Sequence, residues 1–343
     1  MGTSLSDFKS TVLDQLLGLV WRQWAALGVS GYSASEERGV VDPEALLLLT
    51  LTVARYDARL FDEILDWLEV NGDFLNVQRL QNLLKQHDFQ AKAQLSAVAE
   101  RLGRKSTAAL KWKKLTSAYS LDQPEPLFFL KDGRPLPALN EPDEIFRRHG
   151  LLRPPIKLRG YAQPFPAEGM PSLLLRLRAL LGVNVRCEIL CLLGAVDEIH
   201  PSIIAKQVGQ APRTTQNALA EMARSGAVQV RSTAREKIYS LWPGVLDKLL
   251  RPENGRTPWT NSVPLFRAME ILWLGLTDAR LQDLDELMLA SEWRRLSRRM
   301  RPLLGDAGWG QPFRDDAQFK GEKYAEVFRE DVMEFLAHKR LAG

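Results

Sequence analysis

The stretch that decides the fold is residues 201–228, with the sequence PSIIAKQVGQAPRTTQNALAEMARSGAV. Pro201 stands at the start of a short helix, where its missing N–H is not needed for an intrahelical hydrogen bond. This helix ends at Gly209, because glycine readily adopts the left-handed backbone that lets a chain reverse between two packed helices. A second helix is expected from Arg213 to Arg224, and Ser225-Gly226 ends it. The pattern therefore predicts two helices joined by a short glycine-containing turn.

A further helix and a hairpin are expected on either side of this pair. Apolar residues upstream recur at three- and four-residue spacing, which predicts a helix with one buried face: Val185, Ile189, Leu192, Leu193 and Val196. Downstream, residues 227–231 alternate between apolar and polar, and residues 237–242 are rich in residues that favour strands. The polar residues 232–236 lie between these two runs. The downstream segment therefore predicts a β-hairpin with a polar tip.

The second helix of the pair carries polar side chains that are suited to DNA. Its inward side is expected to hold Ala218, Leu219 and Met222, with Thr215 partly inward. Arginine can bind guanine in the major groove, and glutamine and asparagine can bind adenine through two hydrogen bonds. Basic residues at the hairpin are suited to phosphates or the minor groove. The candidate DNA-binding residues are Arg213, Thr214, Gln216 and Asn217 on the helix, and Arg231, Arg235 and Lys237 on the hairpin.

The order of helix, helix, glycine turn, helix, glycine stop and basic hairpin resembles the winged helix-turn-helix superfamily of bacterial transcription regulators, including its ArsR-like and MarR-like groups. Residues 201–209 stand where those families begin the first helix of the motif. Residues 213–228 stand where they have the recognition helix and the strand after it. The resemblance covers residues 183–242, and it implies binding of double-stranded DNA, usually as a homodimer. Winged helices also serve as protein-interaction and RNA-binding modules, because a fold does not determine a function.

Outside this module the chain is predicted to be helical. Asp42-Pro43 is a helix-start signal in front of a leucine-rich run, whereas ten prolines break residues 121–172, of which residues 127–134 predict a strand and a turn. We predict a mainly α fold with a small β-wing, in which helical domains flank the winged helix-turn-helix. The expected domains are an N-terminal helical domain (1–120), a proline-rich linker with local structure (121–172), the DNA-binding domain (173–250) and a C-terminal helical domain (251–343).

Two further basic segments have two interpretations each. The expected helices between residues 60 and 102 end in a basic stretch, and they form either a second helix-turn-helix-like unit or, as we favour, a plain bundle with a solvated basic face. Residues 293–301 carry five arginines at helical spacing. They are candidates for auxiliary phosphate contacts, or they pair with the acidic residues between 278 and 286. The auxiliary candidates are Arg294, Arg295, Arg298 and Arg299.

Several functional classes are not supported by the sequence. Cys187 and Cys191 lie one helical turn apart, and we interpret them as small core residues rather than as a metal or redox pair, so no metal or cofactor is expected. The sequence contains no phosphate-binding glycine loop, zinc-protease motif or serine-hydrolase elbow, so we expect no enzymatic activity. The apolar run at residues 45–54 is too short to span a bilayer, and no signal peptide is evident. We expect a cytoplasmic, bacterial protein that does not bind membranes.

The leading hypothesis is a sequence-specific DNA-binding transcription regulator, whose helical flanks dimerise or bind a small-molecule or protein effector. An alternative is a component of a bacterial defence or toxin-antitoxin system, in which the winged helix serves protein assembly or autoregulation. A third is an enzyme with a fused DNA-binding domain. The net charge of +4 is too small to distinguish among them.

Overall fold

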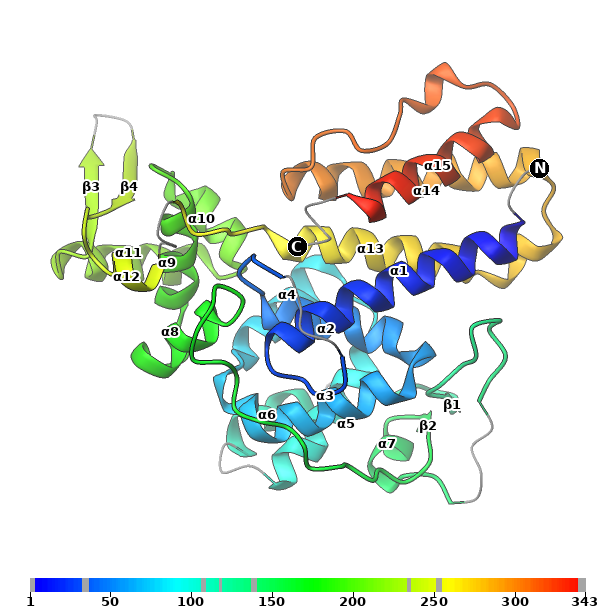
Figure 1. The fold of residues 1–343 in the computed structure, drawn as a ribbon, viewed down its shortest axis with the longest axis horizontal. Helices are drawn as coiled ribbons and strands as arrows, with labels where there is room; N and C mark the ends of the chain where they lie inside the picture. Colours follow the sequence, from blue (N-terminus) through cyan, green and yellow to red (C-terminus); the bar gives the residue numbers. More distant parts are fainter. Residues whose placement is uncertain are drawn as a thin grey trace.

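Capped, leucine-rich helices form most of the chain (Figure 1). The computed structural model describes residues 4–32, 37–105, 109–116, 119–136, 141–232, 236–250 and 255–338. Their secondary structure is mainly helical, with one antiparallel and one parallel two-stranded sheet. The expectation of a mainly α fold with a small antiparallel sheet is therefore confirmed. Within these ranges, no helix combines the length and the apolarity needed to cross a membrane.

The N-terminal helices surround one fully buried helix. All residues of α2 are buried, because α1, α4, α5 and α13 pack around it. Asp42 caps α2 by accepting a hydrogen bond from the Ala45 N–H, and Pro43 is its first residue, which confirms the predicted start signal. The N-terminal helices are α1 (Leu5–Ala26), α2 (Pro43–Val53), η1 (Ala54–Tyr56), α3 (Ala58–Asn71), η2 (Gly72–Phe74), α4 (Val77–His87), α5 (Lys92–Lys105) and α6 (Ala109–Thr116).

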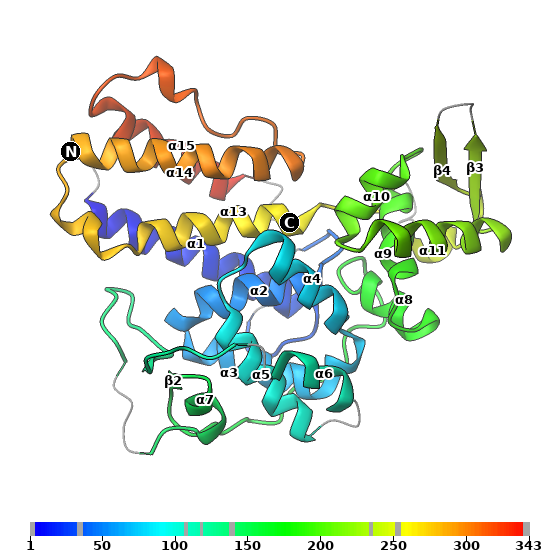
Figure 2. The same ribbon diagram turned by 180° about the vertical axis from the view of Figure 1, so that it is seen from behind.

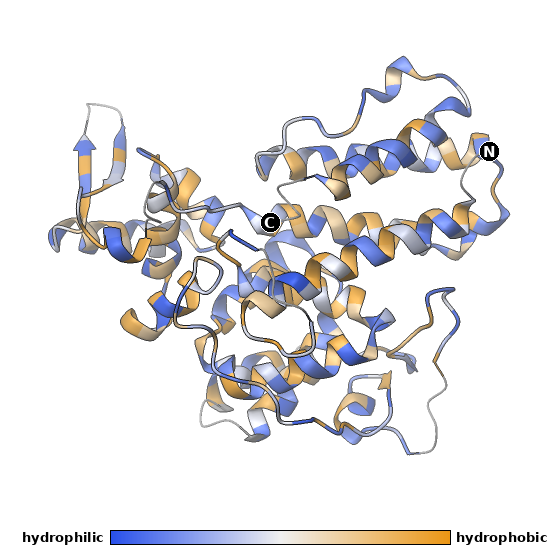
Figure 3. Ribbon diagram, in the orientation of Figure 1, coloured by the Kyte–Doolittle hydropathy of each residue, from blue (hydrophilic) through white to orange (hydrophobic). Residues whose placement is uncertain are grey.

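The C-terminal helices pack directly on the N-terminal ones. They are α13 (Ser262–Leu276), η3 (Ala279–Asp283), α14 (Glu286–Asp306), η4 (Asp316–Gln318) and α15 (Lys323–Ala337). Helix α13 packs against α2 and α14, and α15 packs against α14 and α1. Figure 3 shows hydrophobic and hydrophilic stretches alternating along α1 and α14, as is typical of helices that bury one side, whereas α13 is buried over most of its length. Residues 1–120 and 251–343, expected as two helical domains, thus contribute to one hydrophobic core, and we call this unit the helical body.

The proline-rich segment is bound to the helical body. It contains β1 (Glu125–Pro126), α7 (Glu144–Arg148) and β2 (Leu151–Leu152), and β1 pairs in parallel with β2. Of the strand and turn expected at residues 127–134, the turn is present, with the Gly133 N–H bonding to the Leu130 carbonyl at 2.9 Å, whereas in place of the strand Phe129 forms an isolated bridge to Pro135. Farther along, Asp66 of α3 accepts hydrogen bonds from the backbone N–H groups of Tyr161 and Ala162. These bonds satisfy backbone groups that a proline-rich chain cannot pair within regular structure.

A second hydrophobic core lies in residues 173–250. Their elements are α8 (Leu173–Leu181), α9 (Val185–Ala195), α10 (Pro201–Val208), α11 (Pro212–Arg224), β3 (Val228–Ser232), β4 (Lys237–Leu241) and α12 (Asp247–Leu250). We call residues 185–241, from α9 to β4, the hairpin module. Figures 1 and 2 show α11 and the β3–β4 hairpin at one end of the molecule, on the side away from α1, α14 and α15.

Candidate nucleic-acid interface

The turn between α10 and α11 depends on Gly209. Its φ of 67° is left-handed, as predicted for the residue that ends α10. A Cβ atom at this position would lie 2.8 Å from a methyl group of Leu83 on α4, so glycine also allows the close approach of the helical body. Helix α10 has its predicted bounds, and α11 begins at Pro212, one residue before the predicted start. The turn therefore determines the direction of α11 relative to α10.

Helix α11 has one buried and one exposed side. The predicted inward residues Thr215, Ala218, Leu219 and Met222 are all buried in the core of residues 173–250. The candidate residues of α11 are all exposed, and within the described part of the chain their side chains make no hydrogen bond or ion pair. We call these four residues the α11 face: Arg213, Thr214, Gln216 and Asn217. Their polar groups are available to a binding partner.

The start of α11 favours an anionic partner. Its N-cap residue, Ala211, has no side chain that accepts the first backbone N–H groups, and the first turn contains no acidic residue. The first N–H groups of a helix lack an intrahelical acceptor, and the helix dipole makes this end positive. Glu221, farther along α11, pairs with Arg186 of α9. The start of α11 therefore combines free donors with the positive charge of Arg213.

The hairpin extends beside α11. Strands β3 and β4 are antiparallel, with Ser232 opposite Lys237. Tyr239 also exchanges two backbone hydrogen bonds of 3.0 Å with Ile199, which joins the segment before α10 to the hairpin. The Lys237 side chain is exposed. Because of the two hydrogen bonds with Ile199, the hairpin has a defined position relative to α10 and α11.

The other two basic hairpin candidates differ from Lys237. Arg231 is exposed but forms an ion pair of 2.7 Å with Glu198. Exposed ion pairs are weak, so Arg231 can exchange this carboxylate for another anion at little cost. Arg235 lies outside the described residues.

Two of the four auxiliary arginines make contacts within the helical body. Arg294 donates a hydrogen bond of 2.7 Å to the carbonyl of Phe319, and its guanidinium lies 4.9 Å from the centre of the Tyr324 ring. Arg298 bonds to the buried carboxylate of Asp316 at 2.6 Å. Both side chains therefore hold the segment between α14 and α15 in place.

The other two auxiliary arginines, Arg295 and Arg299, line a groove between α13 and α14. Arg295 pairs with Glu292 on its own helix, whereas Arg299 is exposed and has no partner among the described residues. The alternative pairing of the arginine run with residues 278–286 is found only in part. Asp278 bonds to Arg280, and the charge of Arg295 also helps to lower the pKa of Asp278. Glu286 likewise pairs with Arg329 of α15. Periodicity alone does not show which side of α14 faces these acids.

Basic residues of α5 and α6 also make contacts within the helical body. Arg101 pairs with Glu69 at 2.8 Å. The ammonium group of Lys111 donates to the carbonyls of Asp73 and Leu75, at 2.6 and 3.1 Å, and burial lowers its pKa to about 8. Both side chains therefore hold helices of the body together.

A buried ionic network that sequence reasoning missed joins the hairpin module to the helical body. Arg79 of α4 donates two hydrogen bonds of 2.6 Å to Asp42 and one of 2.9 Å to Glu44. Arg178 of α8 bonds to Glu44, at 2.7 and 2.8 Å, and to Glu188 of α9 at 2.7 Å. These five side chains are at most 1% exposed. We call them the junction network.

The junction network reaches the start of the α10–α11 turn. Arg79 also donates a hydrogen bond of 2.8 Å to the carbonyl of Val208, the last residue of α10. Although burial alone would raise the pKa of Asp42, Arg79 holds it below its ordinary value. The signal in the sequence was the pair Asp42 and Glu44 directly before the apolar run 45–54, because carboxylates in such surroundings require partners.

The two cysteines pack inside the hairpin module. Cys187 and Cys191 are both fully buried in the second core. Burial raises the pKa of the Cys187 thiol to about 11, and that of Cys191 well above its ordinary value. The Cys187 thiol donates a hydrogen bond of 3.4 Å to the carbonyl of Gly182. Both thiols thus occupy the core position that we expected of them.

The functional argument rests on these residues. A comparison of the chain with family models, curated proteins and solved structures finds no match. Figure 1 shows α11, which carries the α11 face, and β4, which begins at Lys237, at one end of the molecule. The structure separates them from Arg294 and Arg298, which are bound within the helical body. This end of the molecule offers neutral and cationic hydrogen-bond donors to a large anionic partner.

Proposed function

We propose that this chain is a sequence-specific transcription regulator that binds double-stranded DNA. The hairpin module is a winged helix-turn-helix, in which α11 is the recognition helix and the β3–β4 hairpin is the wing. One observation carries the proposal. The α11 face presents four polar side chains that have no partner among the described residues, although the opposite side of the same helix is buried in a core.

The residue types of the α11 face match the chemistry of the major groove. The guanidinium of Arg213 donates two hydrogen bonds to the O6 and N7 atoms of guanine. The side-chain amides of Gln216 and Asn217 each donate to N7 and accept from the amino group of adenine. The hydroxyl of Thr214 binds a phosphate or a base edge. Residues three and four apart share one side of a helix, so Arg213 enters the groove together with both amides.

The surrounding donors hold the DNA backbone. The first N–H groups of α11 bind a phosphate at the start of the recognition helix. Lys237 and Arg231 contact phosphates from the wing, and these contacts set the register without selecting a sequence. The resemblance to bacterial regulators implies a homodimer. Two copies then occupy half-sites separated by about 34 Å, one turn of DNA.

Trp242 favours a second candidate function. This side chain follows β4 and is 52% exposed, and exposed aromatic side chains are common at protein interfaces. Under this candidate the hairpin module assembles with another protein in a bacterial defence or toxin-antitoxin system, and DNA binding serves autoregulation. The substitution Trp242→Ala would then abolish assembly and leave the affinity for duplex DNA unchanged.

Selection from a random library tests the main proposal. The full chain is incubated with random duplexes, the bound ones are sequenced, and affinities for an enriched duplex and a shuffled one are measured. We expect an enriched, palindromic sequence. The double substitution Arg213→Ala with Gln216→Ala should lower the affinity for the enriched duplex at least about tenfold, because each lost base contact is worth about 1–3 kcal/mol.

A matched control lies on the same helix. Arg224 is exposed in the last turn of α11, and Arg224→Ala should leave the affinity for the enriched duplex close to that of the unmodified chain. Equal affinity for all duplexes, with no effect of the double substitution, would contradict specific recognition by the α11 face.

A further inference from the structure

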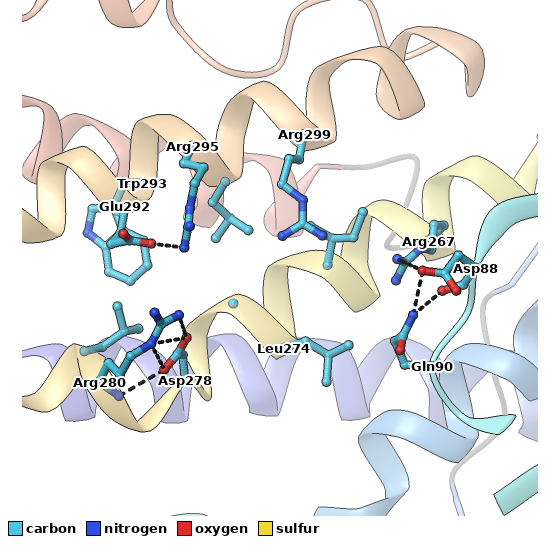
Figure 4. Close-up of a pocket in the computed structure, with 14 residues that line it drawn as sticks. Asp88, Gln90, Arg267, Leu274, Asp278, Arg280, Glu292, Trp293, Arg295 and Arg299 are labelled. Atoms are coloured by element: carbon cyan, nitrogen blue, oxygen red, sulfur yellow. Dashed lines mark hydrogen bonds and ion pairs between the residues drawn. The ribbon is translucent and has the colours of Figure 1, made fainter. Parts of the chain in front are cut away.

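A groove lies between α13 and α14, outside the hairpin module. Its volume is about 510 Å³, which is within the range of small-molecule sites in proteins. At one end it reaches Asp88 and Gln90, in the turn between α4 and α5 (Figure 4). Its apolar lining comes from both helices and the turn after α13: Ile271, Leu274, Leu281, Trp293 and Leu296. Of these five side chains only Leu274 is exposed, and the other four are buried.

Four arginines line the groove: Arg267, Arg280, Arg295 and Arg299. Figure 4 shows Arg295 and Arg299 extending from α14 toward α13, and Arg280 on the opposite side of the groove. The remaining arginine, Arg267, bonds to the buried carboxylate of Glu270 at 2.6 Å and lies 3.8 Å from Asp88. Arg299 differs from the other three, because it has no hydrogen bond or ion pair with any described residue.

The local charges leave one cationic group available. Arg280 forms an ion pair with Asp278 at 2.5 Å, and Arg295 forms one with Glu292. Arg299 lies one helical turn after Arg295 on the same side of α14 and forms no ion pair with a described residue. Leu274, on the α13 side of the groove, is 38% exposed. A free guanidinium above an exposed leucine suits a ligand that has a charged end and an apolar end.

We propose that the groove between α13 and α14 binds a small organic anion, a carboxylate or phosphate with an apolar group. Arg299, assisted by Arg295, binds the anionic end through hydrogen bonds. Leu274 and Leu296 contact the apolar end. This site is separate from the α11 face, so the inference goes beyond the proposed function and does not depend on DNA binding.

Calorimetric titration of the full chain tests the inference with three probes. Phenyl phosphate carries both an anionic and an apolar end, inorganic phosphate lacks the apolar end, and benzyl alcohol lacks the charge. We expect phenyl phosphate to bind at one saturable site, with each of the other probes at least about tenfold weaker. Equal affinity for phenyl phosphate and inorganic phosphate would overturn the apolar part of the site.

Two neighbouring arginines provide a matched pair of variants. Arg299→Gln removes the free guanidinium and should lower the affinity for phenyl phosphate at least about tenfold. Arg298→Gln removes the adjacent arginine, which bonds to Asp316 away from the groove, and should leave this affinity unchanged. Because Arg299 is exposed and pairs with no described residue, its variant should unfold at the temperature of the unmodified chain.

Two outcomes would overturn the assignment. One is an unchanged affinity for phenyl phosphate in Arg299→Gln. The other is displacement of phenyl phosphate by short duplex DNA, because the groove would then serve as a contact to the nucleic-acid backbone.

Discussion

The junction network and the α11 face use the same residue type in opposite ways. Arg79 is fully buried and bonds to two carboxylates and a backbone carbonyl. Arg213 is exposed, and no described residue pairs with it. A buried charge left without a partner is strongly destabilising, so Arg79 cannot exchange its partners, whereas Arg213 can take a new one. The comparison separates arginines that hold the molecule together from those available for binding.

The two regions lie on either side of Gly209. The junction network ends at the carbonyl of Val208, and α11 begins a few residues later, at Pro212. The buried charges therefore set the position from which the exposed ones reach a partner. A substitution in the junction network should mainly lower the stability of the fold. One on the α11 face should change binding and leave stability unchanged.

The substitution Arg178→Met in the junction network should cause the largest loss of stability. It leaves Glu44 with Arg79 and the backbone N–H of Asn76 as partners, and it leaves Glu188 without its bonding partner in the core. Removing one partner of a buried ion pair costs about 3–5 kcal/mol, so we expect the free energy of unfolding to fall by that amount in a urea titration.

A second variant checks the cause of that loss. In Arg178→Met with Glu188→Leu, the carboxylate left unpaired in α9 is also removed, so part of the lost stability should return. If the single variant is as stable as the unmodified chain, the junction network does not fix the hairpin module.

The pH dependence of unfolding tests how much the ionised Asp42 stabilises the fold. Burial opposes its charge, but Arg79 holds the folded-state pKa below the ordinary value of 3.8. A lowered pKa stabilises the fold above the unfolded-state value, and this contribution is lost as the pH falls through the folded-state pKa. We expect the free energy of unfolding to decline below about pH 4, by up to about 1.4 kcal/mol per pH unit for this group.

Urea titrations from about pH 6 to about pH 2 measure this decline. The variant Asp42→Asn cannot ionise at this position, so its stability should depend less steeply on pH over the same range. Parallel pH profiles for the two proteins would show that Asp42 is not stabilised by Arg79.

The smallest effect is expected at an exposed ion pair that also joins the hairpin module to the helical body. Lys206 of α10 lies 2.8 Å from Asp306 of α14, and the two side chains are 63% and 43% exposed. Exposed pairs contribute about 0–1 kcal/mol, so Lys206→Ala should change the free energy of unfolding by less than about 1 kcal/mol. A loss as large as that of Arg178→Met would contradict the distinction between buried and exposed charges.

Local structure in the hairpin module could be predicted from the sequence, because it depends on neighbours along the chain. Helix periodicity placed Ala218, Leu219 and Met222 inward, and all three are buried. Gly209 ends α10 because its backbone must be left-handed there. The exposed positions of the α11 face follow from the same periodicity.

Contacts between distant segments could not be predicted in this way. Thr52 of α2 donates a hydrogen bond of 2.7 Å to Glu270 of α13, and no local pattern links these two residues. The spacing of Arg294 and Arg298 showed that they share one side of α14. It could not show that this side faces Asp316 and the carbonyl of Phe319. Such partners are set by the packing of whole helices.

The salt dependence of duplex binding tests the central claim most directly. The affinity of the full chain for one duplex is measured over a series of salt concentrations, for the unmodified protein and for Lys237→Ala. Binding through phosphates releases counterions, so the logarithm of the affinity should fall linearly with the logarithm of the salt concentration. Lys237→Ala should lower the magnitude of that slope by about one. An affinity that does not depend on salt, with the same slope in both proteins, would contradict DNA binding by the α11 face and the hairpin.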